Sequence, residues 1–424
     1  MKTGQFSARY NLTPNGIRYY IEQGLLTPKK KGHQYDFDEE CVQQMEEIQQ
    51  LKQMHYSLGE ISRIFHVNGL IQHTLNADAR SKYNRIFLTK ISELEGTIAE
   101  LRHCIDILKQ STLPTDEVAS NFIAGLPVSC ISMLTCPHCG QTLDFSDAEI
   151  RSNKIISGHV TCSCGYSLDI TDGILISDYE DPGQMHIEWS NLLNLLSEYS
   201  TEYLNLEANS YYLLKTSILQ ECGKNDRETI SGTIFTSGGY AGDFICKYHG
   251  LFDSSCTFII ADQSLDVLQY IKDKIGRLND RFKIIYICDN AFHLPLRNGL
   301  IDFFLDDYSS SEFVFYNPDY PIEKIRPLLK DGALCGGVYT YYSHSAKTLA
   351  TIKREYPNTN IPLFYLDTFK RRMTSNGVQI EENHLVGSTS SPGIGASFDY
   401  HSEGDLLYFY TYFGRLDKNL LKDY

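Results

Sequence analysis

The sequence predicts a multidomain protein that is α-helical near its N-terminus and α/β in its C-terminal half. Three observations lead to this prediction: capped helical segments surround a basic hairpin, two cysteine pairs lie in the middle of the chain, and strand-like apolar runs later alternate with helical segments. A length of 424 residues exceeds what one hydrophobic core usually holds. A hydrophobic content of 42% is sufficient for several folded domains.

The chain is acidic overall, but its N-terminal segment is basic. The formal net charge is -15, whereas residues 1–35 carry only one acid, Glu22, among six Lys and Arg residues. This segment is therefore where a polyanion would be attracted. Because the chain has neither a signal-peptide core nor a long apolar run, we predict a cytoplasmic protein with no membrane segment. In that compartment the 12 cysteines are expected to be thiols or metal ligands.

The N-terminal segment predicts short helices around a turn and a hairpin. Thr13 is a favourable N-cap, and Gly24 ends the helix that follows it. The stretch LLTPKKKGHQYDF predicts a turn and a β-hairpin with Gly32 at its tip. Asp38 and Ser57 then cap two further helices, the second within a capping box. This order is typical of a winged helix-turn-helix domain.

Residues 1–75 resemble the MerR family of bacterial transcription regulators. The resemblance lies in the order and spacing of Thr13, IRYYIEQGLL, Pro28, Gly32, YDFDEE and LGEISRIF. It implies a helix in the major groove of double-stranded promoter DNA, a wing on the flanking backbone, and bacterial RNA polymerase as a partner at the promoter. The residues that it implies at the DNA are Thr13, Asn15, Arg18, Tyr19, Lys29, Lys30, Lys31 and His33. Such contacts mainly position the protein on phosphates and make binding salt-dependent.

The wing departs from the family pattern in one place. The family usually has Gly-Tyr-Arg where this chain has Gly32, His33 and Gln34. The lysine run would then replace the missing arginine through charge alone. The alternative interpretation of the whole segment is a helical domain that binds a protein and carries a basic hairpin.

Residues 78–113 predict a coiled-coil dimerisation helix. Apolar residues recur at alternating spacings of four and three, namely Phe87, Ile91, Leu94, Ile98, Leu101, Ile105 and Leu108. A seam this narrow needs a partner helix, so we predict a homodimer through residues 87–108. Two-fold symmetry would then imply a palindromic operator. Packing within one chain is the alternative, because a seam does not specify its partner.

Residues 130–178 predict a small zinc ribbon. The stretches CPHCG and CSCGY supply Cys136, Cys139, Cys162 and Cys164. Two thiolate pairs suit one tetrahedral Zn²⁺ and leave no open coordination position, so we predict a structural metal. His138 is expected not to be a ligand. The continuation CSCGYSLDITDGILIS resembles the zinc ribbons that accompany class I methyltransferase domains; unmetallated thiols are the alternative.

Residues 184–424 predict amphipathic helices followed by a doubly wound, Rossmann-like sheet. The helices are suggested by Leu192, Leu193, Leu196, Tyr199 and Tyr203. The runs TIFTS, CTFIIAD, KIIYICD, IDFFLDD and ALCGGVYTYY then alternate with helical segments. A glycine-rich turn follows the first run, as a close backbone approach to a ligand requires. Asp262 ends the second run, where a carboxylate accepts ribose hydroxyls; Asp289 and Asn290 end the third, in reach of an adenine edge.

Most of this segment resembles the class I S-adenosylmethionine-dependent methyltransferases. CDNAFHLPLRNGLIDFFLDD and IRPLLKDGALCGG look like two of their motifs. The resemblance implies cofactor contacts from Gly238, Gly239, Gly242, Asp262, Asp289 and Asn290. Two departures count against catalysis, because Thr236 replaces the usual acid and Tyr240 replaces the middle glycine. After the fourth run, DDYSSS stands where many enzymes that methylate amino groups have an Asn/Asp-Pro-Pro-Tyr motif. The similar letters NPDY at 317–320 come too late in the chain and predict a turn. No catalytic residue is therefore assigned.

The leading functional hypothesis is a dimeric MerR-type transcription regulator. Its methyltransferase-like domain would bind S-adenosylmethionine or a small-molecule effector and control promoter binding and distortion. The alternative is an active methyltransferase, acting on a metabolite, peptide or RNA, with an autoregulatory DNA-binding head. A third hypothesis is an interaction module whose pocket is filled.

Overall fold

The computed structural model describes residues 1–32, 34–71, 73, 76–112, 123–177, 198–289, 291–394 and 398–421. The chain divides into two units, Met1–Val118 and Ala119–Tyr424, which are described separately. Several predicted features lie outside the described residues, namely His33, Asn290, Leu192, Leu193 and Leu196.

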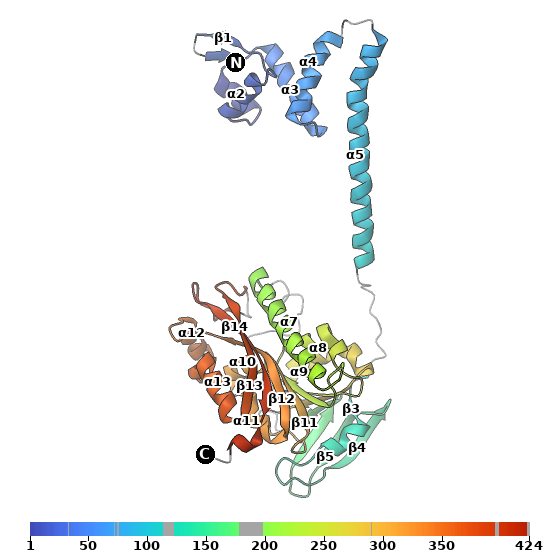
Figure 1. Cartoon of the computed structure of the whole chain (residues 1–424), viewed down its shortest axis with the longest axis vertical. Helices are drawn as coiled ribbons and strands as arrows, with labels where there is room; N and C mark the ends of the chain where they lie inside the picture. The colour runs from blue at the N-terminus through green and yellow to red at the C-terminus, as the bar shows by residue number, and fades with distance from the viewer. Residues whose placement is uncertain are drawn as a thin grey trace. The chain divides into compact units, whose positions relative to one another are not determined.

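The N-terminal unit is a winged helix-turn-helix domain followed by a long helix (Figure 1). Its helices are α1 (Thr3–Arg9), α2 (Pro14–Glu22), α3 (Glu39–Gln53), α4 (Leu58–Ile71) and α5 (Ala77–Ser111). Strands β1 (Lys29–Lys31) and β2 (Gln34–Asp36) form the antiparallel hairpin of the wing. The order of elements predicted from the sequence is therefore confirmed.

Local capping explains why these helices begin where they do. The Gly16 amide donates to Thr13 Oγ1 at 3.0 Å, and the Cys41 amide donates to Asp38 Oδ1 at 3.3 Å. Glu60 accepts from both the amide and the hydroxyl of Ser57 at 2.7 Å, which confirms the capping box. Each cap satisfies amide groups that the first helical turn leaves without a partner.

One apolar core joins the wing to the helices. The rings of Phe6 from α1 and Phe37 after β2 stack with centroids 4.3 Å apart. Ile17 and Tyr20 are the buried residues of α2, so the remaining faces of that helix stay exposed. The start of α5 reaches the same core, because Phe87 packs against Tyr56 with ring centroids 6.1 Å apart.

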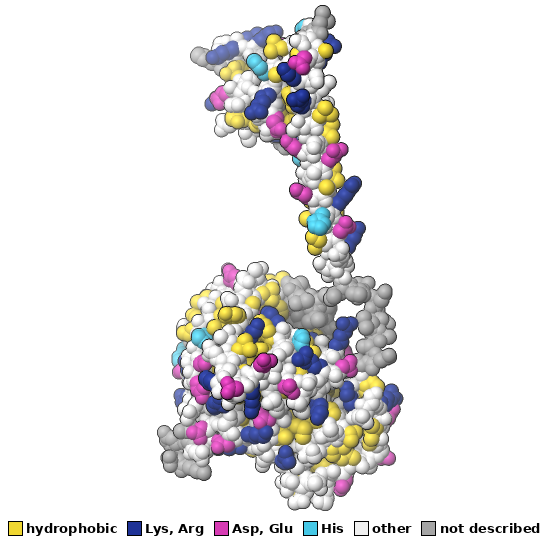
Figure 2. All heavy atoms as spheres, turned by 45° about the vertical axis from the view of Figure 1, so that its right-hand side comes forward, with side chains coloured by type: hydrophobic (Ala, Val, Ile, Leu, Met, Phe, Trp, Pro, Cys, Tyr) yellow, Lys and Arg dark blue, Asp and Glu magenta, His cyan; other side chains and the backbone are white. Residues whose placement is uncertain are grey.

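The long helix α5 has no buried side chain. The seam residues Ile91, Ile98, Leu101, Ile105 and Leu108 are 47–66% exposed. Figure 2 shows hydrophobic side chains at the surface along this helix. Among the described residues, no helix combines the length and apolarity that a membrane span requires.

The C-terminal unit is built on a 12-stranded sheet in the order β13-β14-β12-β11-β8-β9-β10-β7-β6-β5-β3, with β4 paired to β5. The first strands are β3 (Leu126–Pro127), β4 (Asp144–Arg151), β5 (Lys154–Thr161), β6 (Ser167–Thr171) and β7 (Ile174–Ile176). The later strands are β8 (Thr233–Ser237), β9 (Thr257–Asp262), β10 (Lys283–Cys288), β11 (Ile301–Asp307), β12 (Leu329–Tyr341), β13 (Val378–Thr389) and β14 (Leu407–Leu416). The helices are α7 (Thr201–Lys224), α8 (Asp243–Tyr248), α9 (Leu265–Lys274), α10 (Ser309–Tyr316), α11 (Pro321–Ile325), α12 (Thr348–Glu355) and α13 (Leu366–Ser375).

The seven strands from β8 to β14 have the methyltransferase-type order. Strands β10, β9, β8, β11 and β12 are parallel neighbours, while β14 lies between β12 and β13 and runs antiparallel to both. Every residue of β8 and β9 is buried, as expected of parallel strands with helices on both faces. This arrangement confirms the predicted α/β sheet and places the carboxyl ends of the parallel strands β8, β9 and β11 at one edge.

The cysteine-containing ribbon is continuous with this sheet, which the sequence did not predict. Strand β7 pairs in parallel with β10, and Leu175 lies opposite Ile287. Strands β6 and β7 are antiparallel, so the ribbon extends the sheet past β10. Lys272 on α9 is paired with Asp172 between β6 and β7. The ribbon therefore also supports the edge of the methyltransferase-type sheet, because its strand β7 lies beside β10.

Candidate functional sites: a basic head, a four-cysteine cluster and an aromatic crevice

The exposed face of α2 carries the predicted DNA-contacting residues. Asn15, Arg18 and Tyr19 are exposed, whereas Ile17 and Tyr20 point into the core. Thr13 serves as the N-cap, so its side-chain oxygen is occupied by an intrahelical contact. Among the described residues, Arg18 makes no ion pair, which leaves its guanidinium available to a phosphate.

The three wing lysines differ in what they contact. Lys29 pairs with Asp38 at 3.1 Å, and Lys31 pairs with Asp36 at 3.1 Å. The hydrogen bond from Lys31 lowers the pKa of Asp36, so this carboxylate is charged at neutral pH. Lys30 is exposed and has no ion pair within the described part of the chain. Lys30 is thus the wing lysine with the least neutralised charge.

The four predicted cysteines form one cluster. Their Sγ atoms all lie within 4.8 Å of one another, with Cys136 to Cys164 at 3.5 Å and Cys139 to Cys162 at 3.4 Å. Four sulfurs about 2.3 Å from one Zn²⁺ would be separated by about 3.8 Å, so this donor set fits a tetrahedral thiolate site. The His138 ring contacts the Tyr166 ring instead, with centroids 5.1 Å apart.

Each pair of cysteines lies on a tight turn that requires glycine. Gly140 and Gly165 have φ values of 75° and 94°, in the left-handed region. The Gly140 amide donates to the Cys136 carbonyl at 2.8 Å, and the Gly165 amide donates to the Cys162 carbonyl at 2.9 Å. The two turns thereby present their thiols to a common point.

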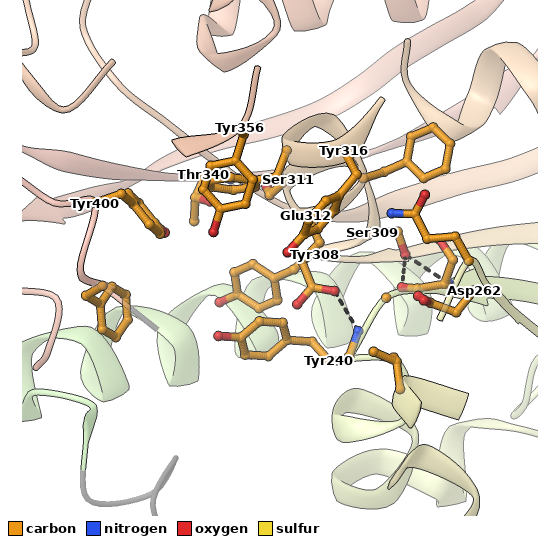
Figure 3. A pocket seen from close by; sticks show the side chains of 18 of the residues that line it. Tyr240, Asp262, Tyr308, Ser309, Ser311, Glu312, Tyr316, Thr340, Tyr356 and Tyr400 are labelled. Atoms are coloured by element: carbon orange, nitrogen blue, oxygen red, sulfur yellow. Dashed lines mark hydrogen bonds between the residues drawn. The ribbon is translucent and has the colours of Figure 1, made fainter. Parts of the chain in front are cut away.

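A crevice opens at the carboxyl ends of β8, β9 and β11, where ligands of doubly wound sheets bind (Figure 3). Its cavity volume of about 90 Å³ exceeds that of one water-sized site several times over. The lining residues are Tyr203, Ser237, Gly238, Gly239, Tyr240, Asp262, Gln263, Val267, Phe292, Tyr308, Ser309, Ser311, Glu312, Phe313, Phe315, Tyr316, Thr340, Tyr356, Phe398, Tyr400 and Leu407. Aromatic side chains are the commonest of these, and the crevice is not filled.

The crevice contains only part of the cofactor set predicted from the sequence. Gly238, Gly239 and Asp262 line it. Gly242 begins α8 with a φ of 96°, and a Cβ there would meet Ile275. Gly242 therefore shapes the turn from outside the lining.

Asp289 does not line the crevice either. Its carboxylate accepts hydrogen bonds from Ser177 Oγ at 2.6 Å, from the Ala291 amide at 3.0 Å and from the His293 amide at 2.9 Å. These contacts anchor the end of β10 to the residue that follows β7. Asp289 thus joins the ribbon to the sheet.

Asp262 is enclosed at the end of β9. The Ser264 amide donates to its Oδ1 at 2.8 Å. Burial raises the pKa of Asp262 to about 7. A carboxyl that is only partly ionised at neutral pH is typical of functional sites, although structural networks produce such shifts too.

Tyr240 occupies the turn position where the methyltransferase family has glycine. Its hydroxyl forms a hydrogen bond with Tyr199, and its ring lies 5.0 Å from the Tyr308 ring. The Tyr240 side chain therefore packs into the aromatic lining beside the turn.

Glu312 on α10 is a site residue that the sequence analysis missed. The Gly239 amide donates to its Oε2 at 2.6 Å (Figure 3). A Cβ on Gly238 would overlap the same oxygen, so Gly238 must be glycine for Glu312 to approach. The run DDYSSSE contained this residue, but only the turn of β11 into α10 brings it back to the glycine turn.

Three enclosed polar atoms of the lining have no hydrogen-bond partner among the described residues. They are Glu312 Oε1, Tyr308 OH and Ser237 Oγ. Tyr308 and Phe292 also have φ values of 58° and 55°, which bulky residues rarely adopt. Enclosed polar atoms usually have hydrogen-bond partners. Three such atoms without a described partner in one lining therefore indicate a place where water or a ligand binds.

Burial, reinforced by the negative charge of Asp262, raises the pKa of Glu312 well above its ordinary value. An acid shifted upward destabilises the fold increasingly as pH rises above its unfolded pKa near 4.5. We therefore expect Glu312→Gln to melt higher than the wild type at pH 8, by about 2–4 °C for each kcal/mol gained, and this advantage to shrink toward pH 5. Thermal unfolding at both pH values checks this, with exposed Glu403→Gln as the control. An unchanged or lower melting temperature at pH 8 would contradict it.

Comparison with known families supports the N-terminal assignment. Residues 1–67 match the family model described as MerR HTH family regulatory protein. The N-terminal unit thus carries a MerR-type helix-turn-helix domain, a class of DNA-binding domain.

A particular relative extends this similarity beyond the head. The HTH-type transcriptional regulator ZntR homolog of Haemophilus influenzae is 28% identical over 122 residues. The alignment spans 28% of this chain and 87% of that protein.

Several solved structures similar to the chain are methyltransferases. A SAM-dependent methyltransferase from Aquifex aeolicus is 12% identical, with 54% of this chain and 99% of that chain covered and a TM-score of 0.34. Geranyl diphosphate C-methyltransferase from Streptomyces coelicolor A3(2) is 13% identical, with 44% and 71% covered and a TM-score of 0.35. Because these scores are low, the methyltransferase-type fold is assigned from the strand order.

Proposed function

We propose that the protein is a dimeric MerR-type transcription regulator whose methyltransferase-type unit binds a small-molecule effector. S-adenosylmethionine is one candidate effector, because a glycine turn and the acid Asp262 lie at adjacent strand ends, and another small molecule is the alternative. The observation that carries the proposal is the open crevice with enclosed, unsatisfied polar atoms in a chain that also has a MerR-type head. Gly238, Gly239 and Asp262 would contact the ligand, while Gly242 and Asp289 hold the surrounding backbone.

The head supplies the promoter contact in this proposal. Arg18 on α2 and Lys30 on the wing are exposed and lack ion-pair partners among the described residues. Thr13, Asn15, Tyr19, Lys29 and Lys31 would complete the surface that meets double-stranded DNA, with bacterial RNA polymerase as the partner implied by the MerR resemblance. Binding of this kind is dominated by phosphate contacts.

Dimerisation through α5 would place two heads on one operator. We expect Leu101→Lys to convert the dimer to a monomer, because a charge would enter the apolar seam. Analytical ultracentrifugation of the full chain measures this. Glu95→Lys, an exposed position outside the seam on the same helix, should leave the dimer intact. A Leu101→Lys variant that remains dimeric would mean that the seam packs elsewhere.

Ligand control requires only a modest coupling energy. An effector typically changes affinity at a second site by about 1–3 kcal/mol. Bending a DNA site costs about 1–6 kcal/mol, so a coupling of this size can decide whether the deformed promoter complex forms. The effector would act by changing the arrangement of the two heads across the dimer.

An active methyltransferase is the second candidate, favoured by the glycine turn and Asp262 at the crevice. S-adenosylmethionine would supply the methyl group, and this chain would have to orient an acceptor beside it. The residues that line the described crevice include two carboxyl groups, Asp262 and Glu312, that could take a proton from an acceptor. Regulation is the better-supported role because the same chain carries a MerR-type head.

Titration calorimetry of the full chain with S-adenosylmethionine and S-adenosylhomocysteine separates these candidates. Saturable binding without methyl transfer to cell extract supports an effector role, and transfer of labelled methyl groups supports the enzyme. Heat from neither compound would exclude both the enzyme and this effector, and would leave a different small molecule to be identified.

A further inference from the structure

The crevice is acidic and aromatic, and this combination restricts the charge of its ligand. Its two ionisable carboxyl groups are Asp262 and Glu312, and no Lys, Arg or His is among its lining residues. Carboxylates enclosed by protein need a cationic partner or hydrogen bonds to offset the loss of water. The lining itself provides no such cation.

Glu312 is only partly satisfied by the protein. Its Oε2 accepts from the Gly239 amide at 2.6 Å, while its Oε1 is enclosed without a partner among the described residues. Burial raises the pKa of Glu312 and favours its protonated form in the empty crevice, whereas a bound positive charge would favour the carboxylate. With one oxygen anchored and one unpaired, Glu312 is positioned to receive a donor or a positive charge from a ligand.

Lys274, whose charge acts on Glu312, is already paired elsewhere. Lys274 Nζ pairs with Asp243 at 2.7 Å and donates to the Gly239 carbonyl at 3.0 Å. Its side chain is 10% exposed, so it is held in this contact. The charge of Lys274 is consequently balanced by Asp243, and Glu312 has no dedicated counter-ion in the described structure.

The aromatic rings beside Glu312 present surfaces that attract cations. Tyr240 and Tyr308 lie 5.0 Å apart, and Tyr356 contacts both Phe315 at 5.0 Å and Tyr316 at 5.5 Å. Figure 3 shows these labelled tyrosines around the crevice with Glu312 among them. Aromatic faces bind onium groups that have been stripped of water.

We propose that the crevice selects an organic cation, an onium or protonated amine without a carboxylate, and binds its charged group between Glu312 and the tyrosine rings. This inference rests on the proposed ligand-binding role and specifies the class of ligand; of the two effector classes proposed above it favours a small-molecule cation over S-adenosylmethionine, which carries a carboxylate. A ligand that brought a carboxylate to the glycine turn would meet Glu312 at the Gly239 amide, and like charges would oppose it. Glu312 is thus a specificity-determining residue.

A matched pair of probes tests the charge requirement directly. Choline and 3,3-dimethylbutan-1-ol have the same shape, but only choline is charged. Titration calorimetry of the full chain should give saturable choline binding at millimolar concentration or below, at least about tenfold tighter than the neutral alcohol. Equal binding of the two probes, or no saturable binding of choline, would overturn the proposal whether or not any variant folds.

Variants then assign the preference to Glu312. In Glu312→Gln, which keeps an acceptor for the Gly239 amide, the preference for choline should fall to about twofold or less, while Glu403→Gln should retain it. A preference that persists in Glu312→Gln would also overturn the assignment. If choline fails but S-adenosylmethionine binds in the separate titration, the proposed effector role stands and only the cation selectivity is lost.

Discussion

Replacing Cys136 and Cys164 by serine is expected to abolish zinc binding and to lower the melting temperature of the C-terminal unit by at least about 10 °C. The four thiols converge within 4.8 Å, and this donor set fits one tetrahedral metal ion. The ribbon that they fold also supplies β7 to the edge of the sheet beside β10. Loss of the metal should therefore destabilise more than the ribbon itself.

Elemental analysis and thermal unfolding of the purified chain measure the two effects. The wild type should contain about one zinc per chain, and Cys104→Ser, an exposed cysteine outside the cluster, should match it. Wild-type protein that is fully stable after removal of all bound metal would refute a structural zinc site.

Replacing Arg18 and Lys30 by alanine should weaken operator binding by roughly 10²–10³-fold at physiological salt. Both side chains are exposed and without ion pairs in the described structure, so their charge is available to phosphates. The logarithm of the binding constant falls linearly with the logarithm of the salt concentration, and removing one phosphate-binding cation makes this slope shallower by about 0.9. Because a dimer carries two copies of each side chain, the double variant should reduce the slope by about 3–4.

Fluorescence anisotropy measures both the operator affinity and its salt slope when it is repeated over a series of salt concentrations. The probe is duplex DNA selected from a random pool by the wild-type chain. Lys109→Ala removes an exposed lysine on α5, serves as the control for loss of a positive charge away from the head, and should bind as the wild type does. Lys29 and Lys31 should matter less than Lys30, because each already pairs with an aspartate. Equal affinity and slope in the double variant would show that α2 and the wing do not meet the DNA.

The head could be predicted from the sequence because its signals are local. The caps at Thr13, Asp38 and Ser57 lie within three residues of the amides that they satisfy. The strands β8 to β12 were likewise predicted from short apolar runs, and the structure confirms them. Strand β13 was not predicted, because it alternates exposed polar residues and is defined by its pairing with β14. Strand β14 is a buried, aromatic-rich run that the sequence analysis missed.

The ligand crevice was harder to predict because its members come from distant segments. Asp289 follows a strand as a cofactor-contacting acid would, yet Ser177 and two backbone amides occupy its oxygens. The contact of Glu312 with the Gly239 amide joins α10 to the turn after β8. Spacing along the chain does not reveal either contact, since both depend on which strands are neighbours in the sheet.

In the proposed mechanism, a ligand in the crevice controls the DNA-binding head. The most direct test compares operator affinity with the crevice empty and with the crevice saturated by ligand. S-adenosylmethionine and choline are the probes, with saturation verified by calorimetry. The account predicts that at least one saturating probe changes operator affinity about fivefold or more, and that Glu312→Gln reduces the change caused by choline. Operator affinity that is identical in the absence and presence of every probe that saturates the crevice would contradict it.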